Sequence, residues 1–146
     1  ARFQEVMAHD STTAPLLRER FHSTLLAFVR EVVAPLLSCT PDEVAFQRVP
    51  TLRVSVPADV PMGHPHCDAE YHHQAGELNF WMPLTAVSGS NTLHTETAPG
   101  AADFHPLELG WGRCVRFWGN RCRHHCLVNT SSFTRVSLDF RAIPVR

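Results

Sequence analysis

The sequence predicts a mainly β protein, a double-stranded β-helix or jelly roll with an N-terminal helix packed on one sheet. From Val44 onward, short runs of alternating apolar and polar residues are separated by Pro, Gly, Asn and Ser, which is typical of a sandwich or barrel. Before Val44, apolar residues recur at helical spacing instead. A chain of 146 residues, 44% hydrophobic and 18% charged, fits one domain over residues 1–146.

The N-terminal helix is expected within about residues 13–37. Thr12 and Thr13 can cap its start, and Pro15 suits its first turn. We expect it to continue up to Pro35, because a proline ring disturbs a helix interior. The apolar residues at helical spacing are Phe21, Leu25, Phe28 and Val32.

Five runs predict the strands of the barrel, over about residues 44–144. Each run is rich in β-branched or aromatic residues and is bounded by turn residues. We find no internal repeat, low-complexity tract or linker. The runs are VAFQRVPTLRVSV (44–56), GELNFWMPLTAV (76–87), NTLHTET (91–97), GRCVRFWG (112–119) and TRVSLDFRAI (134–143).

Charge and hydropathy point to a small-molecule partner. Thirteen basic and fourteen acidic side chains give a formal net charge of −1, and no run of like charge predicts binding to nucleic acid or an anionic membrane. No apolar run reaches the roughly 18 residues that cross a bilayer. The chain begins with Ala1, which leaves open whether a further segment precedes it in the natural protein. The sequence carries no signal for an oligomeric state.

The cysteines favour a reducing compartment. Five cysteines are an odd number without the spacing of a disulfide framework, so we expect free thiols, with the cytoplasm as the favoured location. Cys122 and Cys126 bracket two histidines, but a single C-x3-C pair is weak evidence for structural zinc.

The segment HPHCDAEYHH, residues 64–73, predicts a metal site. His66 and Asp68 are two residues apart, so in an extended segment both side chains point to one face and can share an ion. A third ligand would come from a facing strand, where RCRHHCLVN offers His124 or His125. Two histidines and one carboxylate on one face of an ion suit non-haem Fe(II) oxygen chemistry.

The run NTSSFTRVSLDFR predicts a site for an acidic ligand. Arg135 lies eleven residues after His124, and Ser137 shares its face of the strand. An inward arginine in a barrel requires an anion, and its guanidinium fork fits a carboxylate. The alternative is an internal ion pair with Asp139 or Glu77.

Three motifs together resemble the Fe(II)/2-oxoglutarate-dependent dioxygenases. They are H-x-D at His66 and Asp68, a distal H-x4-N that begins at His124, and TRVSLDFR at residues 134–141. The stretches YHHQAGELNFWMPLT and SNTL resemble a subgroup that includes the streptomycin-biosynthesis oxygenases. The resemblance covers about residues 48–144.

The resemblance implies a jelly-roll fold in which His66, Asp68 and one distal histidine hold ferrous iron. The remote carboxylate of 2-oxoglutarate would pair with Arg135 and hydrogen-bond Ser137. Such enzymes use O2, with ascorbate as a supporting reductant, and release succinate and CO2 while they oxidise a small metabolite. Hydroxylation is the expected outcome, and an Asp at the carboxylate position argues against the halogenase variants.

The family pattern bears on the choice of distal ligand. It places this histidine five residues before an Asn and eleven before the Arg, and both Asn129 and Arg135 then select His124. A spacing of ten occurs in related enzymes and would select His125. Only one of the two neighbours can reach the iron from a regular strand.

Five further residues are candidate contacts for ligands. Asn79 and Trp81 alternate on the strand after the metal pair, so Asn79 can bond 2-oxoglutarate and Trp81 can form cavity wall or core. Arg53, on TLRVSV, is a rival anchor for the anion or a substrate contact. Tyr71 and His73 follow the H-x-D on an expected loop at the barrel mouth and are substrate candidates.

Two other functions fit the same barrel. A cupin-like isomerase or binding module would use the metal without 2-oxoglutarate, but it has no need for an inward Arg135 beside Ser137. A non-catalytic member would retain the fold alone, and the presence of all the expected ligand types counts against it.

Overall fold

The computed structural model describes residues 14–145, which divide into two compact units. One contains residues 14–48 together with 144 and 145, and the other is Val49–Ile143. No helix among the described residues is long and apolar enough to cross a membrane.

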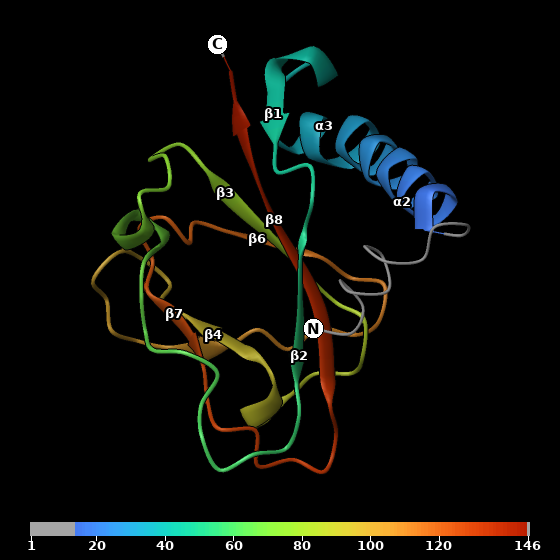
Figure 1. Ribbon diagram of the computed structural model, residues 1–146. Coiled ribbons are helices and arrows are strands. Elements are labelled where there is room, and N and C mark those ends of the chain that lie inside the picture. Colours follow the sequence, from blue (N-terminus) through green and yellow to red (C-terminus); the bar gives the residue numbers. More distant parts are fainter. Residues whose placement is uncertain (1–13, 146) are drawn as a thin grey trace. The chain divides into compact units, whose positions relative to one another are not determined.

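The N-terminal unit is helical at its start, as predicted. Helix α2 (Ala14–Phe28) continues through a π-helical turn (Val29–Val33) into α3 (Ala34–Leu36) (Figure 1). The expectation that the helix stops before Pro35 was wrong. The N–H of Ala34 donates to the carbonyl of Val29, and this wider turn accommodates a proline that has no N–H of its own.

The buried residues of this helix agree only in part with the predicted apolar positions. Leu25, Val29 and Val33 are buried at intervals of four, whereas the predicted Val32 is 39% exposed. The predicted capping residues, Thr12 and Thr13, lie outside the described residues.

A short turn and strand complete this unit. The 3-10 turn Pro41–Glu43 is closed by the Glu43 carboxylate, which accepts a 2.8 Å hydrogen bond from the Thr40 N–H. Strand β1 (Val44–Phe46) follows, and the carbonyl of Glu43 accepts a bond from the N–H of Val145 at 2.8 Å.

The second unit contains two antiparallel sheets. In the larger one, β2 (Thr51–Ser55) pairs with β8 (Arg135–Pro144), β8 pairs with β3 (Leu78–Pro83), and β3 pairs with β6 (Val115–Phe117) (Figure 1). Each of these strands falls in a predicted run.

The smaller sheet has β4 (Leu93–Thr95) between β5 (His105–Pro106) and β7 (His124–Cys126). The two-residue β5 is too short to produce an alternating pattern in the sequence. The predicted mainly β, jelly-roll architecture is therefore confirmed.

The larger sheet contributes both an apolar and a polar part to the interior of this unit. Trp81 from the larger sheet packs with Leu93 and Cys126 from the smaller one in an apolar cluster. Strand β8 instead presents a buried polar row, with Arg135, Ser137 and Asp139 exposed by 1%, 0% and 6%. This row forms one wall of the candidate site.

Candidate metal centre

Three side chains converge as the sequence predicts. His66, Asp68 and His124 each offer a ligand atom, and these atoms all lie within 4.8 Å of one another. Backbone pairing brings them together, because the N–H of His66 donates to the carbonyl of His124 at 3.2 Å and the reverse bond measures 3.0 Å. Asp68 Oδ1 lies 3.9 Å from Nε2 of His66 and 3.6 Å from Nε2 of His124.

Backbone carbonyls orient both imidazoles. Nδ1 of His66 lies 2.8 Å from the carbonyl oxygen of His64, and Nδ1 of His124 lies 3.1 Å from that of Cys122. When Nδ1 carries the proton and donates, Nε2 has a free lone pair. With Nδ1 bonded in this way, Nε2 is the nitrogen of each ring that is directed toward the Asp68 carboxylate.

Asp68 is a buried carboxylate with two strong donors. Its Oδ2 accepts hydrogen bonds from Nδ2 of Asn79 at 2.7 Å and from Nε of Arg141 at 2.9 Å. Burial by itself raises the pKa of Asp68, but the bonds from Arg141 and Asn79 outweigh it and hold the pKa at about 2. The carboxylate is thus charged at neutral pH and suited to a cation.

Burial favours the neutral form of His124. Burial lowers its pKa, and the opposing effects of the Cys122 carbonyl and the Asp68 charge are smaller. A neutral imidazole is the form that coordinates metal ions.

The low pKa of Asp68 predicts an acid-dependent loss of stability in the metal-free protein. The folded-state pKa of about 2 lies below the ordinary 3.8, so the charged Asp68 carboxylate stabilises the folded protein. This stabilisation is fully present above pH 3.8 and disappears as the pH falls through 2. The shift corresponds to about 2 kcal/mol. Urea unfolding across this pH range should show that Asp68→Asn lacks this component, and equal pH dependence of wild type and variant would contradict it.

The geometry favours His124 over His125 as the distal ligand. The ring centroids of His124 and His66 are 4.5 Å apart. His125 follows on the other face of β7, where its ring stacks on His94 at 5.8 Å and meets Phe104 edge-on at 4.7 Å.

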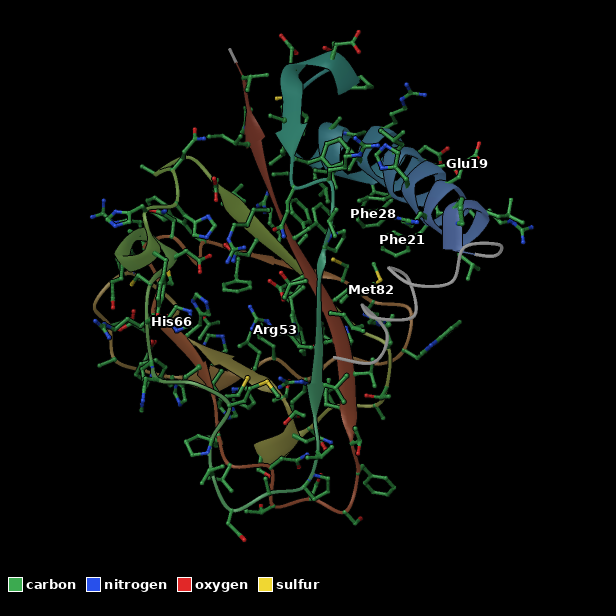
Figure 2. All side chains as sticks on the ribbon, viewed as in Figure 1. Glu19, Phe21, Phe28, Arg53, His66 and Met82 are labelled. Atoms are coloured by element: carbon green, nitrogen blue, oxygen red, sulfur yellow. The ribbon has the colours of Figure 1, made fainter. Side chains whose placement is uncertain are left out.

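A cavity lined by His66 and His124 extends to Arg135. Its empty space is about 500 Å³, a figure that includes open solvent at the mouth. Figure 2 shows Arg53 and His66 in the region that the two sheets enclose, and both line this cavity. The wall also includes Asn79, Trp81 and Arg141.

Arg135 is a buried cation for which no carboxylate partner is found among residues 14–145. Its Nη2 lies 3.2 Å from Sγ of Cys126, and its Nη1 lies 3.4 Å from the carbonyl of Asn91. Nε of Arg135 and Oγ of Ser137 are both buried without a hydrogen-bond partner in the described part of the chain. Such groups are costly unless a ligand satisfies them.

The alternative partners predicted for Arg135 are engaged elsewhere. Asp139 Oδ1 accepts a 2.7 Å bond from Nε of Arg53, and Glu77 Oε2 lies 2.9 Å from Nδ1 of His73. The internal ion pair considered for Arg135 is therefore not formed with either carboxylate.

The other candidate residues divide into two groups. Asn79, Trp81 and Arg53 line the cavity, although both ends of the Asn79 amide have protein partners, Asp68 and the Gly119 N–H. Trp81 is both wall and core, because it is 2% exposed and belongs to the apolar cluster.

Tyr71 and His73 are not among the residues that line the cavity. Tyr71 is 64% exposed, and its ring meets that of His66 edge-on at 5.1 Å. The 3-10 turn Asp68–Tyr71 and the left-handed His72 turn the chain here, so strand alternation does not place these side chains.

Neither Arg141 nor Gly119 was expected at the metal site. Arg141 was predictable in part, because it continues the two-residue period of Arg135 and Asp139 on β8. Gly119 was not predictable, because it is far from Asp68 in the sequence. Its carbonyl accepts a 2.9 Å hydrogen bond from the N–H of Asp68. A Cβ on Gly119 would lie 2.6 Å from Oδ1 of Asn79.

Comparisons with known proteins agree with this architecture. No protein-family model matches the chain. The streptomycin biosynthesis protein StrG of Streptomyces griseus is 36% identical over 115 residues, which cover 79% of this chain and 54% of StrG. The chain thus spans about half the length of this curated relative.

Two solved structures share the fold. EvdO2 from Micromonospora carbonacea var. aurantiaca, complexed with 2-oxoglutarate, is 17% identical with a TM-score of 0.64, over 86% of this chain and 64% of EvdO2. The nickel complex of the non-heme monooxygenase ThoJ is 15% identical with a TM-score of 0.59, over 97% of this chain and 63% of ThoJ. The chain therefore has the cupin-like jelly-roll fold that these two proteins share.

Proposed function

We propose that this chain forms the core of a non-haem Fe(II)- and 2-oxoglutarate-dependent oxygenase that oxidises, by default hydroxylates, a small metabolite. The observation that carries the proposal is the buried Arg135, which has no carboxylate partner in the described chain and lines the same cavity as His66 and His124. A cupin-like domain without an acidic ligand has no use for such a cation.

His66, Asp68 and His124 fit ferrous iron. Two imidazoles and one carboxylate on one side of an ion are the ligand set of non-haem Fe(II) oxygenases, which keeps other positions open. When bound, the iron would supply activation of O2 coupled to decarboxylation of 2-oxoglutarate, with release of succinate and CO2.

Arg135 and Ser137 would hold the remote carboxylate of 2-oxoglutarate. The ligand would offer acceptors to Nε of Arg135 and Oγ of Ser137, the two buried atoms without partners in the described residues. Trp81 lies beneath the guanidinium, with Cζ 6.0 Å from the ring centroid, and would keep water from this contact.

Arg53 is the best-placed candidate for contact with the substrate. Its side chain is 42% exposed, lines the cavity and is held through Nε by Asp139. The terminal nitrogens of its guanidinium could then bind polar or acidic groups of a metabolite. Tyr71 stays a weaker candidate beside His66, and His73 is held by Glu77.

The related proteins support this proposal. EvdO2 was solved with 2-oxoglutarate, and ThoJ is a monooxygenase that was solved with nickel, an ion that competes for Fe(II) ligand sets. StrG, the relative in sequence, is a biosynthetic protein.

Succinate formation from 2-oxoglutarate tests the proposal. Protein reconstituted with Fe(II) and ascorbate should release succinate in air, and the correct metabolite in a screen should raise the rate. Asp68→Asn should release none. A wild-type protein that binds metal but forms no succinate with any metabolite would favour the cupin-like alternative.

A further inference from the structure

The two oxygens of the Asp68 carboxylate have different surroundings. Oδ2 accepts from both Nδ2 of Asn79, at 2.7 Å, and Nε of Arg141, at 2.9 Å. Oδ1 is the oxygen that faces Nε2 of His66 and Nε2 of His124, at 3.9 Å and 3.6 Å. One oxygen thus faces protein donors and the other faces the candidate metal ligands.

The two donors are held in place by the fold. Asn79 on β3 and Arg141 on β8 are direct partners in the antiparallel register, so they project from one face of the larger sheet. Oδ1 of Asn79 accepts a 3.1 Å bond from the N–H of Gly119, which fixes the amide with its nitrogen toward Asp68. Only glycine fits beside this amide at position 119, because a Cβ there would lie 2.6 Å from Oδ1 of Asn79.

Glu77 is a second carboxylate near the Arg141 guanidinium. Its Oε2 lies 3.9 Å from Nε of Arg141, the same nitrogen that bonds Asp68. Arg141 is largely buried, with 13% of its side chain exposed. Charge-assisted bonds of this kind are strong when water is excluded.

We infer that Arg141 and Asn79 are positioning residues that occupy Oδ2 of Asp68 and leave Oδ1 alone for the metal. A carboxylate free to bind through both oxygens would take one more coordination position. Occupying Oδ2 keeps that position open for the 2-oxo acid. The inference rests on the proposed function for the identity of this acid.

Arg53 provides a matched control on the same sheet. Its Nε donates to Oδ1 of Asp139 at 2.7 Å, so it forms an arginine–aspartate pair that lines the same cavity. Neither Arg53 nor Asp139 is a candidate metal ligand. Loss of this pair removes a similar charge pair without freeing Oδ2 of Asp68.

The test counts exchangeable waters on Mn(II) bound to the full chain by water-proton relaxation. Arg141→Gln should still bind Mn(II) but with about one water fewer than wild type, because Asp68 then binds through both oxygens. Its affinity for 2-oxoglutarate should fall about 10- to 100-fold. Asn79→Ala should show the same changes to a smaller degree, and Arg53→Gln should keep the wild-type water count.

The water counts distinguish a positioning role of Arg141 and Asn79 from a purely structural one. A wild-type water count in Arg141→Gln, or in Asn79→Ala if Arg141→Gln does not fold, overturns the inference and leaves these residues with a structural role. The proposed function fails separately, if Mn(II)-loaded wild type loses no water when 2-oxoglutarate is added. The variants' water counts are read without 2-oxoglutarate and are unaffected by that result.

Discussion

Replacing His124 with alanine is expected to abolish binding of one equivalent of divalent metal and, with it, turnover. His124 and His66 direct Nε2 toward Oδ1 of Asp68, and removal of any of the three leaves too few ligands. His66→Ala and Asp68→Asn should have the same effect. His125→Ala should bind metal almost normally, because the His125 ring packs against His94 and Phe104.

Calorimetric titration with Ni(II), together with metal analysis of the purified variants, measures this difference. Circular dichroism shows whether each variant is folded. The result that contradicts the assignment is metal retention by His124→Ala with loss by His125→Ala. The inward and outward faces of β7 would then be exchanged.

Arg135→Gln should weaken binding of 2-oxoglutarate by at least about 100-fold, because one partner of a buried charge pair is lost. Metal affinity should be unchanged, since Arg135 has no contact with His66, Asp68 or His124 among its described bonds. Ser137→Ala should cost about tenfold, the effect of one hydrogen bond to a charged group.

Arg53 is the control for this prediction, because it is the rival anchor on the same cavity wall. Titration of Ni(II)-loaded variants with 2-oxoglutarate compares the two arginines directly. A large loss in Arg53→Gln with normal binding in Arg135→Gln would transfer the role to Arg53 and leave the burial of Arg135 unexplained.

The parts of the site that follow strand periodicity were predictable from the sequence. Arg135 and Ser137 are two residues apart on β8, and both are buried on the same face. His66 meets His124 through an isolated β-bridge, whereas Asp68 begins a 3-10 turn, so strand alternation explains the position of His66 but not that of Asp68.

The remainder depends on contacts that periodicity does not describe. Asn79 was expected to bond 2-oxoglutarate, yet its amide bonds Asp68 and Gly119, which lie far from it in the sequence. The helix continues through Pro35 because a local change to π-helical hydrogen bonding accommodates the proline ring. No pattern of residues in the sequence predicted that change.

Anaerobic addition of 2-oxoglutarate to the Fe(II)-loaded protein tests most directly whether the metal ligands and Arg135 form one site. Chelation of Fe(II) by a 2-oxo acid produces a visible charge-transfer absorption band. We expect this band in wild type, no band in Asp68→Asn, and a band in Arg135→Gln only at much higher 2-oxoglutarate concentrations. Wild-type protein that holds Fe(II) but shows no band at saturating 2-oxoglutarate would contradict this expectation.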